Sequence, residues 1–150
     1  MADRINAEAF IAPTFGQRLG GRLLDGLLLV PVVVVLGLIL SGAPLRVMEF
    51  SVAAAYDIIG TAVWGQTVGK HIVGTRVVST VSDHLQPAQA VTRFLAYGGI
   101  GFALGLFVPA LSLLCAIVVL APILRPPLHR GLHDLAARTI VVPTRTWSAR

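Results

Sequence analysis

The chain alternates between long apolar stretches and short polar segments, and the first two apolar stretches are long enough to cross a bilayer. Residues 23–40 contain a single charge, Asp25. A helix rises about 1.5 Å per residue and a hydrocarbon core is about 30 Å thick, so this stretch nearly spans the core. The second stretch is richer in small residues and ends at Trp64, a residue type common at membrane interfaces. We predict transmembrane helices over about 18–41 and 47–64.

The third apolar stretch, residues 94–124, is uncharged and has an awkward length. As one helix it would be roughly 46 Å long, too much for one span without strong tilt. Two full spans would need about 40 residues. Pro109 lies near the centre and favours a break into two short helices over about 90–108 and 110–124. A single long tilted span is the alternative.

Two polar segments, the loop 65–89 and the tail 125–150, carry most of the remaining basic residues. By the positive-inside rule both should face the cytoplasm, with both termini on that side. Residues 73–81 are rich in β-branched side chains and predict a short strand. Residues 139–143 have the same character, after an amphipathic piece over 128–138. If the two β-branched segments pair, they must lie on one side of the membrane.

Composition agrees with a lipid environment. Hydrophobic residues make up 55% of the chain and charged residues 13%, whereas soluble domains have roughly 25% charged residues. A chain this short leaves much of its surface exposed, so it could not hide that apolar surface in water. We therefore predict an all-α integral membrane protein, a small bundle of three to four transmembrane segments in a bacterial-type plasma membrane.

Charge and cysteine content limit the partners. Twelve Lys and Arg residues oppose seven Asp and Glu, but the basic residues flank apolar spans and do not line one polar face. We therefore expect membrane lipids as partners and no nucleic acid. Cys115 is the single cysteine, so no internal disulfide can form. The first fifteen residues contain no apolar stretch with a cleavage site, so we expect no removable signal peptide.

Three motifs, in the same order as in a known family, cover residues 16–142. They are Arg18-Leu-Gly-Gly-Arg-Leu-Leu-Asp25, the segment from Tyr56 through Gly65-Gln-Thr-Val-Gly-Lys70 to Gly74-Thr-Arg-Val-Val78, and Arg130-Gly-Leu-His-Asp134 continuing to Val142. Together they resemble the RDD family, named for one arginine and two aspartates. The resemblance implies that the signature residues are Arg18, Asp25 and Asp134. Individual members have been proposed as monovalent cation/proton antiporters, which implies a candidate transport role.

The first span holds three charged residues on one helix. Arg18 and Asp25 lie nearly two turns apart, whereas Arg22 lies three positions before Asp25 and is its nearer partner. A carboxylate at this depth needs a partner or a wet crevice. We favour a structural ion pair that orients the first helix. The alternative is a protonatable cation site whose affinity Arg18 or Arg22 tunes.

Asp57 lies about ten positions into the second span, with no basic residue near it in sequence. It must become neutral, or recruit Arg22 or a cation across the helix interface. Proton carriers in transporters need such a carboxylate. We nevertheless favour a hydrogen-bonded carboxyl that locks the first two helices together.

The loop motif after the second span contains Gly65, Gly69, Lys70 and Arg76. It lacks the spacing, the following Ser or Thr and the preceding strand of a phosphate-binding Walker loop. We interpret it as a tight turn whose Lys70 faces lipid phosphates.

The closing motif carries His129 and His133 four residues apart, a spacing that a helix can use for a metal ion. The sequence offers no further ligand cluster, so we expect no metal and no cofactor. We expect Asp134 to cap a helix or to form an ion pair with Arg18, Arg93 or Arg138.

These residues lead to two hypotheses for function. In the first, the protein has a transport role and exchanges protons for monovalent cations through Asp25 and Asp57, with Arg22 nearby. In the second, it is a non-catalytic accessory or scaffold subunit of a larger membrane complex. Enzymatic activity is the least favoured class, because no nucleophile, base and orienting group occur together. Gly101 and Gly105 form a GxxxG motif that permits a homo-oligomer.

Overall fold

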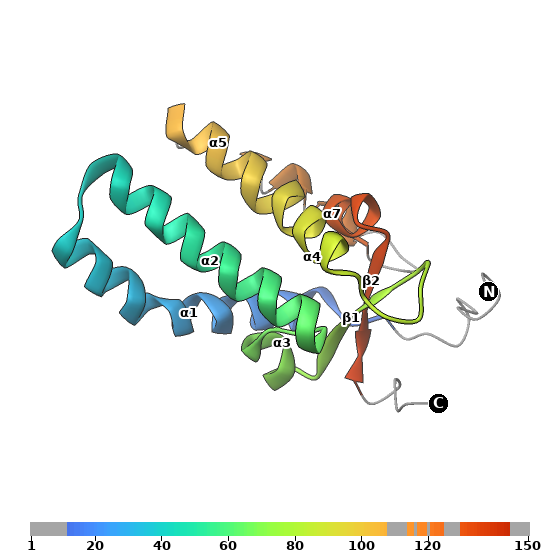
Figure 1. The fold of residues 1–150 in the computed structure, drawn as a ribbon. Helices are drawn as coiled ribbons and strands as arrows, with labels where there is room; N and C mark the ends of the chain where they lie inside the picture. Colours follow the sequence, from blue (N-terminus) through green and yellow to red (C-terminus); the bar gives the residue numbers. More distant parts are fainter. Residues whose placement is uncertain (1–11, 108–113, 116, 120, 125–129, 145–150) are drawn as a thin grey trace.

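A computed structural model describes residues 12–107, 114–115, 117–119, 121–124 and 130–144 (Figure 1). The protein is mostly helical, with 73% of the described residues in helices. Two strands form a small antiparallel sheet in addition to the helices.

The first two helices have the length and composition of membrane spans. An 18-residue stretch of helix α1 (Phe15–Ile39) has a mean hydropathy of 2.3, and one of α2 (Gly42–Trp64) has a mean hydropathy of 1.2. The two helices are joined by a short turn and lie side by side (Figure 1). Large side chains on α1 are exposed, Leu38 at 82%. An apolar surface of this kind suits contact with lipid, so the protein is a membrane protein.

Both predicted spans are confirmed as helices, with different starting points. Helix α1 begins at Phe15 because Thr14 caps it: the Thr14 hydroxyl accepts a hydrogen bond from the Gln17 backbone N–H at 3.2 Å. Helix α1 continues through Pro31 without a break in its assignment. Helix α2 begins at Gly42, earlier than predicted.

A third helical run follows the loop. Helix α4 (Pro87–Phe94), the π-helix η3 (Leu95–Gly99) and α5 (Ile100–Phe107) are continuous. Helix α4 begins at Pro87, three residues before the predicted start of the span, because proline needs no backbone donor in the first turn of a helix. The run coincides with the predicted span over 90–108, but its crossing of the membrane stays a prediction. Pro109 lies outside the described residues, and a short 3-10 helix, η4 (Ala121–Leu124), follows.

A small polar layer covers one end of the long helices. It consists of α3 (Val68–Ile72), β1 (Thr75–Ser79), α7 (Leu132–Ala136) and β2 (Thr139–Pro143). Strands β1 and β2 pair with Val77 opposite Val141, which confirms the predicted pairing of the two β-branched segments. Their buried side chains form the core of this layer, with the members Val77, Val78, Ile140, Val141 and Val142. Figure 1 shows this layer beside the start of α1, the end of α2 and the start of α4.

The turn between α2 and the polar layer depends on Gly65. This residue ends α2 with a φ of 70°, a left-handed conformation that favours glycine. Its carbonyl oxygen accepts a hydrogen bond from the Val77 N–H at 2.7 Å. A Cβ at this position would lie 2.8 Å from Nε of Arg76. The tight turn predicted from the loop motif is therefore confirmed at Gly65.

Candidate functional site

Three buried carboxylates lie where the long helices meet the polar layer. Asp25 of α1 and Asp57 of α2 are each 3% exposed, and Asp134 of α7 is 0% exposed. Each carboxylate has a different set of partners. We call the three surroundings the Asp25 site, the Asp57 site and the Asp134 site.

The Asp25 site joins α1 to α3 through neutral donors. The Asp25 carboxylate accepts hydrogen bonds from the Tyr56 hydroxyl at 2.6 Å, the Thr67 hydroxyl at 2.6 Å and the Gly69 backbone N–H at 2.7 Å. Thr67 is the N-cap residue of α3, so the carboxylate lies at the start of that helix. A carboxylate with three donors is well solvated by the protein.

Gly69 allows this contact because it has no side chain. A Cβ at Gly69 would collide with the carbonyl oxygen of Gly21 and would lie 2.8 Å from Oδ1 of Asp25. Gly21 is similarly confined, since its Cβ would lie 3.1 Å from a methyl group of Val73. Two glycines on facing elements therefore let α3 pack directly against the backbone of α1.

The predicted ion pair between Arg22 and Asp25 is corrected by this geometry. Among the described residues, Arg22 forms its ion pair with Asp57, with Nη1 at 3.1 Å from Oδ1. The physical reason is that three donors already satisfy Asp25, whereas Asp57 needs a cation. The prediction that Asp57 recruits Arg22 across the helix interface is confirmed.

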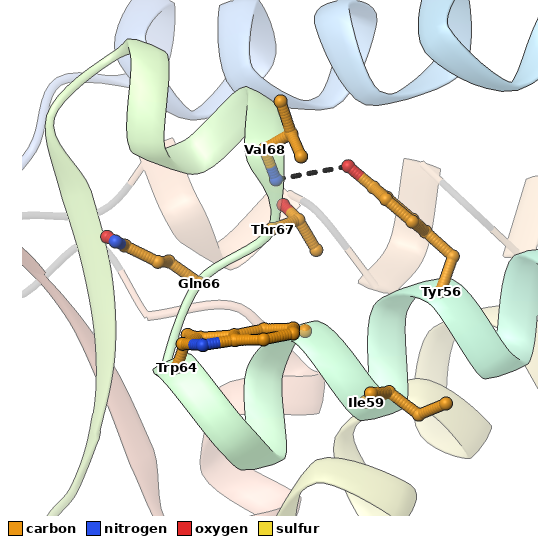
Figure 2. A pocket seen from close by; sticks show the side chains of 7 residues that line it. Tyr56, Ile59, Trp64, Gln66, Thr67 and Val68 are labelled. Carbon is orange, nitrogen blue, oxygen red and sulfur yellow. Dashed lines mark hydrogen bonds between the residues drawn. The ribbon is translucent and has the colours of Figure 1, made fainter.

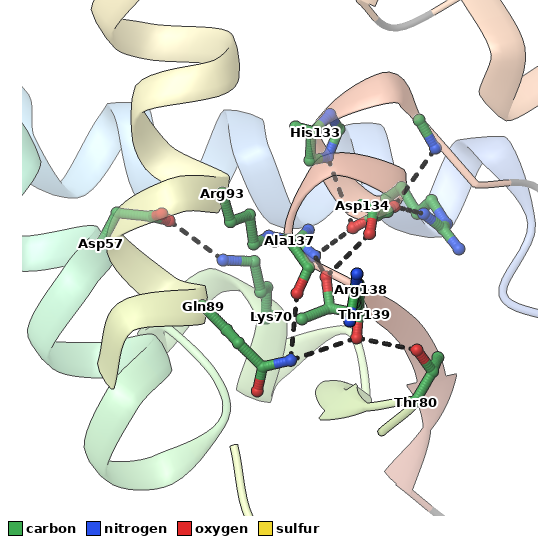
Figure 3. Close-up of polar contacts among 12 residues, drawn as sticks. Asp57, Lys70, Thr80, Gln89, Arg93, His133, Asp134, Ala137, Arg138 and Thr139 are labelled. Carbon is green, nitrogen blue, oxygen red and sulfur yellow. Dashed lines mark hydrogen bonds and ion pairs between the residues drawn. The ribbon is translucent and has the colours of Figure 1, made fainter. Parts of the chain in front are cut away.

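The Asp57 site contains a second cation, which the sequence had led us to expect at the membrane surface. Lys70 Nζ lies 3.0 Å from Oδ1 of Asp57, and Lys70 is only 8% exposed. The prediction that Lys70 faces lipid phosphates is therefore wrong. Helix α3 packs against α1, and the Lys70 side chain reaches Asp57 on α2 (Figure 3). The sequence held one clue, because Lys70 is the only lysine of the chain.

Burial lowers the pKa of Lys70 to about 8, and the charges of Arg22 and Arg93 act in the same direction. The Asp57 carboxylate opposes this shift. The Lys70 ammonium group can therefore lose its proton near neutral pH, whereas an ordinary lysine has a pKa of about 10.4 and keeps its proton there.

The Asp134 site fastens α7 to α1 and α4. Oδ2 of Asp134 lies 3.1 Å from Nη1 of Arg18, and Oδ1 accepts a hydrogen bond from Nη1 of Arg93 (Figure 3). The Gly131 N–H donates to Oδ2 at 3.2 Å. The predicted pairs with Arg18 and Arg93 are confirmed. Arg138, the third predicted partner, is exposed, and its backbone carbonyl accepts a hydrogen bond from Thr80.

Electrostatics keep Asp134 ionised and His133 neutral. Burial alone would raise the pKa of Asp134, but the charges of Arg93 and Arg18 lower it below its usual value. Burial, helped by the charge of Arg93, lowers the pKa of His133 to about 3. Nε2 of His133 lies 3.6 Å from Oδ1 of Asp134. His129, the other histidine of the four-residue metal spacing, lies outside the described residues.

Tyr97 connects the Asp57 site with the Asp134 site. Its hydroxyl accepts a hydrogen bond from Nη1 of Arg22 at 2.8 Å, and the Arg22 guanidinium lies 4.5 Å from the ring centroid. The same ring contacts His133 edge-on, with centroids 5.6 Å apart. Tyr97 lies in the π-helix η3, a kind of segment often found at functional sites. Sequence reasoning missed Tyr97, because nothing in its local pattern signals a π-helix.

A hollow of about 160 Å³ lies beside Tyr56, between the end of α2 and the start of α3 (Figure 2). Its lining residues are Tyr56, Ile59, Gly60, Trp64, Gln66, Thr67 and Val68. The Tyr56 hydroxyl accepts from the Val68 N–H at 3.1 Å and donates to Asp25. Two of the lining residues, Tyr56 and Thr67, therefore donate hydrogen bonds to the Asp25 carboxylate.

The predicted site residues thus fall into two groups. The structure brings together Arg18, Arg22, Asp25, Asp57, Lys70 and Asp134 at the junction of spans and polar layer. Arg76 is half-buried on β1, opposite Val142 in the sheet, and takes part in none of the three sites.

Comparison with known protein families gave a match over most of the chain. The model of the RDD family matches residues 12–138, a range that includes all three carboxylates. Comparison with curated proteins and with solved structures gave no match.

Proposed function

The chain belongs to the RDD family, and from that premise we propose that it exchanges a monovalent cation for a proton across the plasma membrane, at the Asp57 site. The observation that carries the proposal is the buried contact between the Lys70 ammonium group and the Asp57 carboxylate at 3.0 Å. Carboxylates inside membrane proteins commonly mark ion or proton pathways.

The chemistry of exchange follows from this contact. With its proton, Lys70 neutralises Asp57 from inside the protein. When Lys70 Nζ releases the proton, the carboxylate loses one of its two cationic partners and attracts a cation from solution. Return of the proton to Nζ expels that cation. The pKa of Lys70 of about 8 supports such a cycle near physiological pH.

Charge balance supports a stoichiometry of one cation per proton. Arg93 also acts on this site but is paired with Asp134. Apart from that pair, two negative charges, of Asp25 and Asp57, face two positive ones, of Arg22 and Lys70. Loss of one proton leaves one negative charge in excess, and one monovalent cation restores neutrality. Unbalanced buried charge costs several kcal/mol, so the two states should alternate.

The fold supports a multi-pass topology with cytoplasmic termini. Strand β1 follows α2, β2 lies in the C-terminal segment, and the two strands pair in one layer. Because a sheet cannot cross the bilayer as an open pair, both segments belong on one side. An even number of crossings must then separate them, which favours two short spans over 90–108 and 110–124. The basic residues of this layer favour the cytoplasmic side.

Flux measurement in proteoliposomes tests the exchange. We expect Na⁺, K⁺ or Li⁺ to dissipate a pH gradient in vesicles with the wild type, and Asp57→Asn to abolish this. Lys70→Arg should also abolish it, because a guanidinium keeps the ion pair but does not release its proton. Arg138→Gln, at an exposed position, serves as the matched control. Wild-type flux equal to that of empty liposomes would exclude exchange.

A second candidate function is an accessory subunit of a larger membrane complex. Two of the carboxylates favour this function, because they join different elements as structural contacts do. Asp25 joins α1 to α2 and α3, and Asp134 joins α7 to α1 and α4. In that case the protein would purify in mild detergent with one stoichiometric partner and show no flux. A second copy of the chain is a further candidate partner, which mass measurement in detergent would detect.

A further inference from the structure

Two buried oxygen atoms of α2 have no hydrogen-bond partner in the described part of the chain. They are Oδ2 of Asp57 and Oγ1 of Thr61. The two residues are 3% and 0% exposed. Side chains four positions apart lie on the same face of a helix, with Cβ atoms about 5–6 Å apart. The same face of α2 therefore presents a carboxylate oxygen and a hydroxyl oxygen next to each other.

The behaviour of Thr61 is unusual for a threonine inside a helix. Such a hydroxyl commonly donates to the carbonyl four residues earlier, as the Thr92 hydroxyl does to Ala88 at 2.8 Å. Thr61 makes no such bond. A buried polar atom without a partner costs free energy. Its oxygen is therefore free to act as a ligand.

We propose that Oδ2 of Asp57 and Oγ1 of Thr61 supply two of the ligands for one small monovalent cation of the Na⁺ class. This inference rests on the exchange function proposed above and names the atoms that bind the substrate. Hard cations are bound through oxygen, with carboxylates as the charged ligands. The two cationic side chains contact Oδ1 of Asp57, so Oδ2 is the oxygen left for the substrate.

The surrounding charges favour a monovalent over a divalent ion. Asp57 is faced by Arg22 from α1, Lys70 from α3 and Arg93 from α4, and Arg93 is itself paired with Asp134. Tyr97 from η3 also faces Asp57, and Asp25 from α1 faces Arg22. One monovalent cation replaces the single charge that Lys70 gives up. A divalent ion would leave one positive charge in excess in a buried site.

Calorimetric titration of the purified protein with NaCl at pH 9, where Lys70 is mainly deprotonated, tests the site. Thr61→Val keeps the shape and removes the hydroxyl, and we expect Na⁺ affinity at least tenfold weaker. Thr61→Ser keeps the hydroxyl and should stay within threefold of the wild type. Thr92→Val, the matched control on α4, should not change the affinity. Should Thr61→Val fail to fold, Thr61→Cys replaces the oxygen with a soft sulfur and should weaken binding likewise.

The outcomes separate the site from the function. Equal Na⁺ affinity in the wild type and in Thr61→Val overturns the inference. A wild type that binds no Na⁺ overturns it as well, because a water molecule would then be the partner of these two oxygens. Binding that depends on Thr61, without flux, supports the site and rejects exchange. Flux that is unchanged in Thr61→Val supports exchange and rejects this site.

Discussion

The contact between Gly69 and the backbone of α1 gives the most specific prediction about stability. In Gly69→Ala the new methyl group collides with the carbonyl oxygen of Gly21. Because that atom belongs to the backbone of a long helix, it cannot move aside, and α3 must shift. The shift breaks the hydrogen bonds from the Gly69 N–H and the Thr67 hydroxyl to Asp25. Hydrogen bonds to charged groups contribute about 1.5–3 kcal/mol each, so we expect a loss of about 3–6 kcal/mol.

Equilibrium unfolding in mixed micelles, followed by circular dichroism during titration with a denaturing detergent, measures this loss. Gly26→Ala is the matched control, because a Cβ added to Gly26 on α1 would meet nothing within 4 Å. There alanine should raise the stability by about 0.5–1 kcal/mol, since it favours a helix over glycine. If Gly69→Ala stayed within about 1 kcal/mol of the wild type, the close packing of α3 on α1 would be refuted.

Three further predictions concern the other sites. Asp134→Asn leaves two buried guanidinium groups without a carboxylate, so we expect the free energy of unfolding to fall by about 3–5 kcal/mol. The same unfolding assay measures this, with Asp83→Asn at an exposed position as control. The apparent Na⁺ affinity should rise about tenfold between pH 7 and pH 9, because the deprotonated fraction of Lys70 increases as the pH passes its pKa of about 8. Calorimetry should find no such rise in Lys70→Arg, and a rise in that variant would contradict the role of Lys70. The side of the membrane can be tested in a Cys115→Ser background with two single variants at exposed positions, His84→Cys and Thr144→Cys. Both cysteines should resist a membrane-impermeant thiol reagent in intact cells and react with it in inverted vesicles. Labelling of only one of them from outside would contradict the placement of β1 and β2 on the same side of the membrane.

The membrane helices were predictable because their signal is a local property of the chain. Length and hydropathy alone identified α1 and α2, although α1 begins earlier, after its cap Thr14, and α2 begins earlier, at Gly42. The strand pair was also predictable, since β-branched residues cluster in both segments. The helical run 87–107 was expected as well, but not its π-helical middle. No periodicity in the sequence signals the extra residue of a π-turn.

The charged sites were predictable only in part, because partner choice depends on the packing of distant elements. Asp57 had to find a cation, and this requirement correctly pointed to Arg22. The same requirement did not identify Lys70, since its contact needs α3 to fold back against α2. The expected pair of Arg22 with Asp25 was wrong because three neutral donors, two of them from the segment 67–69, already serve Asp25. Sequence spacing describes neighbours along one helix and not those across an interface.

The late position of Asp134 in the chain has a consequence for biogenesis. Arg18 and Arg93 leave the ribosome long before residue 134 does, and their guanidinium groups share this one carboxylate. Until residue 134 is made, this carboxylate is missing, so we expect both guanidinium groups to stay hydrated and α1 and α4 to pack incompletely. We therefore expect the packing of α1 and α4 to be completed only after the closing motif has been translated.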